Sequence, residues 1–150
     1  MVVTLSKAIF ENLTKQIVSF EDKKKKLIEE YFPQQLKEQD EVENLINQYI
    51  LQLSCFLREA KKAEKNSGRL PLVTIGSEVE VQDLDSEKKY IFRVMMPSEQ
   101  SNAFEGVFNI SFWSPVGKAL LLKKPGDKVT VKAPGGIYNY QIVSINMNVS

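Results

Sequence analysis

The chain contains no histidine, one cysteine and no long apolar run. Without histidine, a Ser-His-Asp or Cys-His nucleophile, a histidine general base and a histidine-ligated zinc site are excluded. The single thiol, Cys55, cannot form an internal disulfide, which is typical of a reducing compartment. No stretch approaches the roughly 18 apolar residues of a membrane span, and the first residues show no secretory pattern. We therefore expect a cytoplasmic protein without membrane association, and not a self-sufficient hydrolase.

Glycine and proline are almost missing from the first half of the chain. Residues 1–66 contain no glycine and one proline, Pro33, whereas all seven glycines and the other five prolines follow. Such a change in composition marks a domain boundary. We predict a helical domain over residues 1–66, a linker over 67–71 and a second domain over 72–150. The net charge of +1 provides no overall attraction to nucleic acid.

Apolar residues of the first half recur in alternating steps of three and four, which indicates helices that pack on each other. They form two stripes: Leu13, Ile17, Phe20, Leu27 and Tyr31, and Val42, Ile46, Tyr49, Leu53, Phe56, Ala60 and Ala63. Pro33 should end the first helix, because a residue before proline disfavours the helical conformation. The connection is short, so the helices must run antiparallel. We predict a coiled-coil hairpin with residues 33–43 at its tip and helices of about 26 residues, or about 39 Å.

The second half has strand patterns. Five runs are rich in β-branched and aromatic residues: 77–85, 88–96, 106–113, 127–133 and 137–145. The run 114–124 predicts a short helix, because Ser114 suits the N-cap and Pro115 the first helical position. The glycines of Pro134-Gly135-Gly136 suit a hairpin. We predict an α+β fold, in which the helical hairpin precedes a twisted, mainly antiparallel sheet with one short helix.

Three segments of the second half carry a family resemblance: "GSEVEVQDLDSEKKYIFRV", "FNISFWSPVGKALLLKKPGDKVTVKAPGG" and "YQIVSI". The S-P-x-x-x-A-L-L run, the G-D-x-V turn and the P-G-G hairpin resemble, in order and spacing, the C-terminal domain of bacterial Gre transcription elongation factors. The resemblance covers about half of the chain. It implies an FKBP-like sheet domain that docks on RNA polymerase and a hairpin that enters the secondary channel. It further implies that acidic tip residues help the polymerase to cleave its own backtracked transcript.

The tip carboxylates, Glu38, Asp40, Glu41 and Glu43, are the candidates for this role. The resemblance implies that they act in trans in the polymerase, and that Asp40 and Glu43 share a Mg²⁺ ion only in the complex. An alternative alignment places Gln35, a poorer Mg²⁺ ligand, at the essential aspartate and Glu38 at the glutamate, which predicts a channel-occupying regulator without cleavage. A third interpretation is structural, with Asp40 and Glu43 as a capping box at a helix start.

Two further segments are candidates for contacts. The resemblance assigns polymerase docking to Trp113, Ser114 and Pro115, although relatives usually have a small polar or acidic residue in place of Trp113. Lys23, Lys24, Lys25 and Lys26 are candidates for contact with nascent RNA or DNA, but four consecutive lysines more often form a solvated helix surface.

The expected partner is bacterial RNA polymerase and the expected state is a monomer, with no cofactor of its own. The fold alone also allows two other functions. One is a prolyl isomerase, with a pocket lined by aromatic residues: Phe92, Phe108, Phe112, Tyr138 and Tyr140. The other is a structural coiled-coil dimer.

Overall fold

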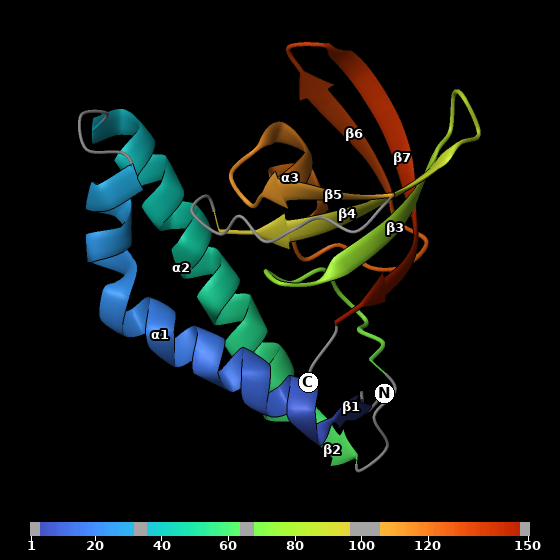
Figure 1. The fold of residues 1–150 in the computed structure, drawn as a ribbon. Coiled ribbons are helices and arrows are strands. Elements are labelled where there is room, and N and C mark those ends of the chain that lie inside the picture. Colours follow the sequence, from blue (N-terminus) through green and yellow to red (C-terminus); the bar gives the residue numbers. More distant parts are fainter. Residues whose placement is uncertain (1–3, 32–35, 64–67, 97–105, 148–150) are drawn as a thin grey trace. The chain divides into compact units, whose positions relative to one another are not determined.

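The computed structural model describes residues 4–31, 36–63, 68–96 and 106–147. The chain divides into two compact units, residues 1–67 and 68–148. The first unit contains β1 (Thr4–Ser6), α1 (Lys7–Tyr31), α2 (Leu36–Glu59) and β2 (Lys61–Ala63). α1 and α2 lie along each other in opposite directions (Figure 1), so the predicted antiparallel pair of helices is confirmed.

The seam between α1 and α2 is apolar over most of its length. The buried side chains are Ile9, Leu13, Phe20 and Ile28 on α1, and Val42, Ile46, Tyr49, Ile50, Leu53 and Leu57 on α2. The predicted stripes drift toward the C-terminal end of each helix, where Ile28 on α1 and Leu57 on α2 are buried more deeply than Leu27 and Phe56. A straight α-helix has 3.6 residues per turn, so it drifts by about 20° per heptad from a strict 3.5-residue repeat.

A small parallel sheet joins the two ends of the first unit at the base of the hairpin. β1 pairs with β2, with Thr4 opposite Lys61 and Ser6 opposite Ala63. Ser6 is also the N-cap of α1, because its Oγ accepts a hydrogen bond from the Ile9 N–H at 3.2 Å. These strands are three residues each, and the sequence pattern did not indicate them.

The second unit is a curled five-stranded sheet with a short helix (Figure 1). Its strand order is β5-β4-β3-β7-β6. The strands are β3 (Glu78–Asp83), β4 (Lys89–Met95), β5 (Val107–Ser111), β6 (Lys128–Ala133) and β7 (Gly136–Asn146). The five predicted strands and the β6–β7 hairpin are confirmed.

One strand pair departs from the expected antiparallel arrangement. β5 runs parallel to β4, with Phe92 opposite Phe108 and Val94 opposite Ile110, so the sheet is mixed. Parallel neighbours cannot be joined by a tight hairpin and need a longer connection. Residues 96–106 provide that length.

The core of the second unit lies between the curled sheet and α3 (Pro115–Leu120). Its fully buried side chains include Val73, Val79, Val81, Leu120, Ile142 and Ile145. Part of the predicted linker belongs to this unit as well. Leu70 is buried and its N–H donates to the Ile145 carbonyl at 2.9 Å, while Gly68 accepts a hydrogen bond from the Met147 N–H at 2.7 Å. Three residues of the predicted linker, 67–71, therefore pair with the end of β7. The polar composition of this segment did not indicate that pairing.

No helix among the described residues is both long enough and apolar enough to cross a lipid bilayer.

Candidate functional site

The acidic run lies inside α2 and not at its start. α2 begins at Leu36, which makes Asp40 the fifth helical residue. An N-cap residue precedes the first helical residue, so the predicted capping box of Asp40 and Glu43 is wrong. The discrepancy exceeds the one or two residues by which helix ends vary between definitions. The tip residues 33–35 and the side chain of Glu38 lie outside the described residues.

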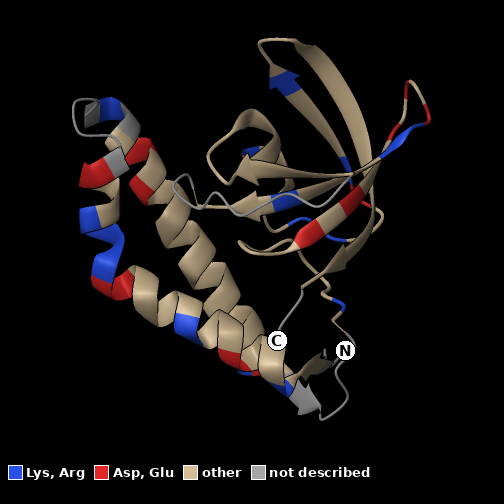
Figure 2. Cartoon of the chain, viewed as in Figure 1, with Lys and Arg blue, Asp and Glu red and all other residues tan. Residues whose placement is uncertain are grey.

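The described carboxylates of the run face solvent without basic partners. Asp40 and Glu41 are exposed and Glu43 is half-buried. Within the described part of the chain, none of the three forms an ion pair. Asp40 and Glu43 are three positions apart, so they are neighbours on the helix surface. Figure 2 marks acidic segments at the end of the hairpin away from β1 and β2, with basic segments of the helices nearby.

Asp40 and Glu43 supply the kind of oxygen ligand that Mg²⁺ prefers, but only two such side chains. Mg²⁺ prefers six oxygen ligands in an octahedron, and two carboxylates provide only part of that shell. The described residues contain no group of three acidic, cysteine or histidine side chains placed to bind a metal. Asp40 and Glu43 therefore fit as partial ligands of a Mg²⁺ ion, with water or a partner completing the shell.

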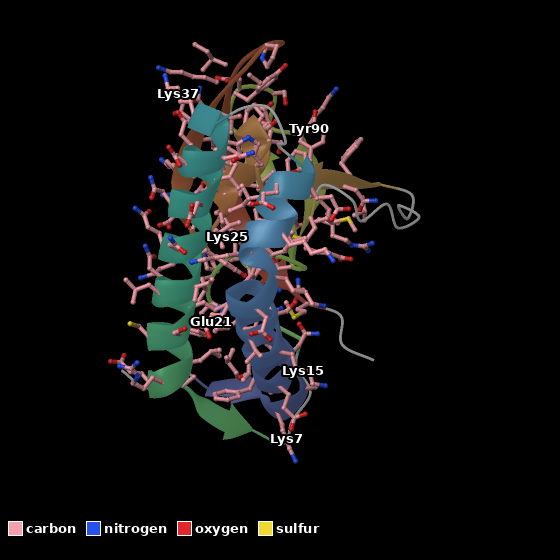
Figure 3. The ribbon with its side chains drawn as sticks, turned by 90° about the vertical axis from the view of Figure 1, so that its left-hand side faces the viewer. Lys7, Lys15, Glu21, Lys25, Lys37 and Tyr90 are labelled. Carbon is pink, nitrogen blue, oxygen red and sulfur yellow. The ribbon has the colours of Figure 1, made fainter. Side chains whose placement is uncertain are left out.

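The four consecutive lysines do not share one environment. Lys23, Lys25 and Lys26 are exposed, whereas Lys24 is half-buried and its Nζ donates to the Asn47 Oδ1 at 2.7 Å. Nearer the base, the Tyr49 hydroxyl donates to the Gln16 Oε1 across the same seam. Lys24 thus links the helices, and three lysines are left for a contact with nucleic acid. Figure 3 shows the hairpin between Lys7 near its base and Lys37 near its far end.

Replacing Lys24 by leucine should stabilise the hairpin. The leucine would continue the apolar seam between Phe20 and Ile28, and Asn47 is exposed enough to bond to water. Burying roughly half a leucine side chain should raise the free energy of unfolding by about 1 kcal/mol. Urea unfolding monitored at the helical circular-dichroism band would measure it. Lys25→Leu, one position away on the exposed surface, is the control. An equal gain in both variants would contradict the seam position of Lys24.

The loop before α3 is held by a dense set of hydrogen bonds around Ser114. Its Oγ donates to the Ser111 carbonyl at 2.7 Å and accepts from the Gly117 N–H at 3.0 Å. Its N–H donates to the same carbonyl at 3.0 Å, and its own carbonyl accepts from the Lys118 N–H at 2.8 Å. Ser114 is therefore the N-cap of α3, as predicted, with Pro115 at the first helical position.

The side chains of this loop form a fixed surface. Pro115 is exposed, Trp113 is half-buried, and the Lys118 Nζ lies 4.2 Å from the centre of the Trp113 ring. An ammonium at this distance is attracted by the negative ring face, which restrains the indole. The sequence pattern indicated Trp113, Ser114 and Pro115 but not Lys118. Lys118 is the fourth residue of α3, and its contact with Trp113 depends on the turn of the helix.

The match to known proteins extends over most of the chain. The family model "Transcription elongation factor, GreA/GreB, C-term" matches residues 70–147. Transcription elongation factor GreA of Thermotoga maritima is 30% identical over 158 residues, which cover 95% of this chain and 96% of that protein. GreA of Thermodesulfovibrio yellowstonii is 36% identical over 106 residues, which cover 71% of this chain and 65% of that protein.

Two solved structures are also similar over nearly the whole chain. Gfh1, GreA factor homolog 1 of Thermus thermophilus, is 28% identical with a TM-score of 0.44, and the alignment covers 97% of this chain and 99% of that one. GreA/GreB of Nitrosomonas europaea is 21% identical with a TM-score of 0.49, covering 97% and 98%. The family model and the full-length match to the Thermotoga maritima protein decide the assignment. This chain belongs to the GreA/GreB family of transcription elongation factors.

Proposed function

We propose that the protein binds bacterial RNA polymerase and stimulates cleavage of backtracked transcripts by the polymerase. The observation that carries this proposal is the pair Asp40 and Glu43 on the distal part of a long hairpin, in a chain of the GreA/GreB family. Neither carboxylate forms an ion pair with another described residue. The hairpin enters the secondary channel, and the protein acts on the active site of the polymerase without being the enzyme itself. Its partner is the elongation complex and it binds as a monomer.

In this proposal each part of the chain has a separate task. Asp40 and Glu43 bring anionic oxygens to a Mg²⁺ ion that the polymerase also ligates. A Mg²⁺ ion in such a site can activate a water molecule and neutralise charge on the transcript. The helices hold the carboxylates at a fixed place, and Lys23, Lys25 and Lys26 are available to RNA or DNA phosphates.

A second function, occupation of the channel without cleavage, is favoured by one observation. Because α2 begins at Leu36, Asp40 and Glu43 lie about 6 Å and 10 Å along the helix axis from its first residue. Glu38 is nearer to the tip, which suits the alignment that places Gln35 at the essential aspartate. A neutral amide there would bind Mg²⁺ poorly.

The test is a transcript-cleavage assay on a halted, backtracked elongation complex with and without the protein. Cleavage stimulation supports the first function. Slower elongation or slower cleavage, with binding intact, supports channel occupation. Absence of binding to the polymerase contradicts both functions.

Docking should depend on the loop around Ser114. Changing both Trp113 and Pro115 to alanine should weaken binding to core polymerase by about 30-fold or more, because a few desolvated anchors dominate such interfaces. The measurement is a fluorescence titration of labelled protein with core polymerase. Val143→Ala, an exposed apolar residue on β7, is the control and should bind like the parent. An unchanged affinity of the double variant would remove this loop from the interface.

A further inference from the structure

Five aromatic side chains from three strands form one cluster on the sheet, which we call the aromatic face: Tyr90, Phe92, Phe108, Tyr138 and Tyr140. Neighbouring ring centroids lie between 5.7 Å (Phe92–Tyr140) and 6.4 Å (Tyr90–Tyr140) apart. The strand register explains the cluster, because directly paired residues share a face of a sheet. Phe92 is paired with Phe108 across β4 and β5.

Two rings of the aromatic face are buried, and the other three are accessible to solvent. Phe92 and Tyr140 are 8% and 6% exposed, whereas Phe108 is 53% exposed and Tyr90 and Tyr138 are half-buried. Tyr138 stacks on Tyr140 with an angle of 8° between the rings. Clustered exposed aromatic surface indicates an interaction site more often than scattered apolar residues do. Phe112 is not part of the cluster, since it is buried in the core.

One carboxylate, that of Asp83, lies beside the aromatic face on the Tyr140 side. Asp83 is paired with Tyr140 across β3 and β7, and its carboxylate Oδ1 accepts hydrogen bonds from the backbone N–H groups of Asp85 and Ser86. Burial, followed by the charge of Asp83 and by the two neighbouring tyrosines, raises the pKa of Tyr140. These surroundings disfavour a further negative charge, and the faces of aromatic rings attract cations. A phosphate-bearing ligand is therefore a poor match.

We propose that the aromatic face binds the guanidinium group of an arginine-bearing segment of a partner protein. Arginine suits the site better than lysine, because its planar, weakly hydrated head group stacks on aromatic rings. The carboxylate of Asp83 lies at the Tyr140 side of the cluster and complements the positive charge. The site uses neither the hairpin nor the loop around Ser114, so it is independent of the proposed function in transcript cleavage.

The test is a titration of the full-length protein with the peptide acetyl-Gly-Gly-Arg-Gly-Gly-amide, followed by aromatic ¹³C NMR. We expect saturable shifts of the Tyr90, Phe108 and Tyr138 resonances. Phe108→Leu keeps the apolar bulk but removes the ring, and it should weaken binding about two- to fivefold. Ile137→Ala, an exposed residue beside Tyr138 in β7, is the matched control and should bind like the parent.

A citrulline peptide tests the charge, because citrulline has nearly the shape of arginine without the cation. Shifts with the arginine peptide and none with the citrulline peptide support the proposal. Equal shifts with both peptides, no shift with either, or an unchanged affinity of Phe108→Leu would overturn it. A short oligouridylate that shifts the same resonances would also overturn it, because nucleobase stacking would then explain the cluster.

Discussion

Replacing Gly117 by alanine is expected to destabilise the second unit by about 3 kcal/mol or more. An added Cβ would lie 2.0 Å from the Ser111 carbonyl oxygen and 2.9 Å from the Phe112 Cα. Both are backbone atoms, which cannot rotate away as the end of a flexible side chain can. Relief would require α3 to move off the end of β5. Because the same contacts hold Ser114, binding to the polymerase should weaken as well.

Urea unfolding of the full chain would measure this loss. Trp113 is the only tryptophan, so its fluorescence reports on the second unit alone. Gly126→Ala is the matched control: Gly126 has a φ of +90° and no atom within 4 Å of an added Cβ. The cost of this control substitution should be only the strain of an alanine in the left-handed backbone region, about 1–2 kcal/mol. Similar losses in both variants would show that the contact with Ser111 relaxes easily.

Converting both Asp40 to asparagine and Glu43 to glutamine should lower transcript-cleavage stimulation by about 100-fold or more. The amides keep the size of the side chains but remove the anionic oxygens that Mg²⁺ prefers. Loss of a supporting group in a metal site already costs about 10- to 100-fold, and these side chains are proposed to touch the ion itself. Affinity for the polymerase should stay nearly unchanged, because docking is proposed to reside in the second unit.

The cleavage assay on a halted complex at saturating protein gives the measurement. Glu21→Gln with Asp22→Asn, two exposed acids in the middle of α1, removes the same charge away from the tip and should leave stimulation intact. Stimulation that survives in the Asp40 and Glu43 amide variant would contradict their metal role. If Glu38→Gln with Glu41→Gln then abolishes it, these two carboxylates carry the metal role instead. A parent protein that stimulates no cleavage would favour the alternative alignment of the tip, with Gln35 at the essential aspartate.

Local patterns were sufficient to predict most of the elements. The steps of three and four, the alternating β-branched runs and the Ser114-Pro115 start depend on neighbours a few residues apart, and the structure confirms the helices and strands that they indicated. The start of α2 was misplaced for an energetic reason. Leucine, lysine, glutamate and glutamine are strong helix formers. The helix therefore begins at Leu36, before the acidic run, and not at the acidic run itself.

Long-range partners were harder to predict because spacing along the chain carries no information on them. The hydrogen bond of Lys24 to Asn47 depends on how two helices meet. The parallel pairing of β5 with β4 and that of β1 with β2 depend on residues far apart in sequence. Strands of three residues also carry too little pattern to be recognised.

The pairing of β1 with β2 determines the direction in which the hairpin can open. These strands tie the first residues of α1 to the last residues of α2, and Leu5, Ile9, Leu13 and Leu53 are almost fully buried nearby. Separation of the helices from this end would require breaking the backbone ladder and exposing that apolar surface together. Fraying should therefore start beside the acidic run and stop before the base, so that amide hydrogens exchange fastest at the end that carries the carboxylates.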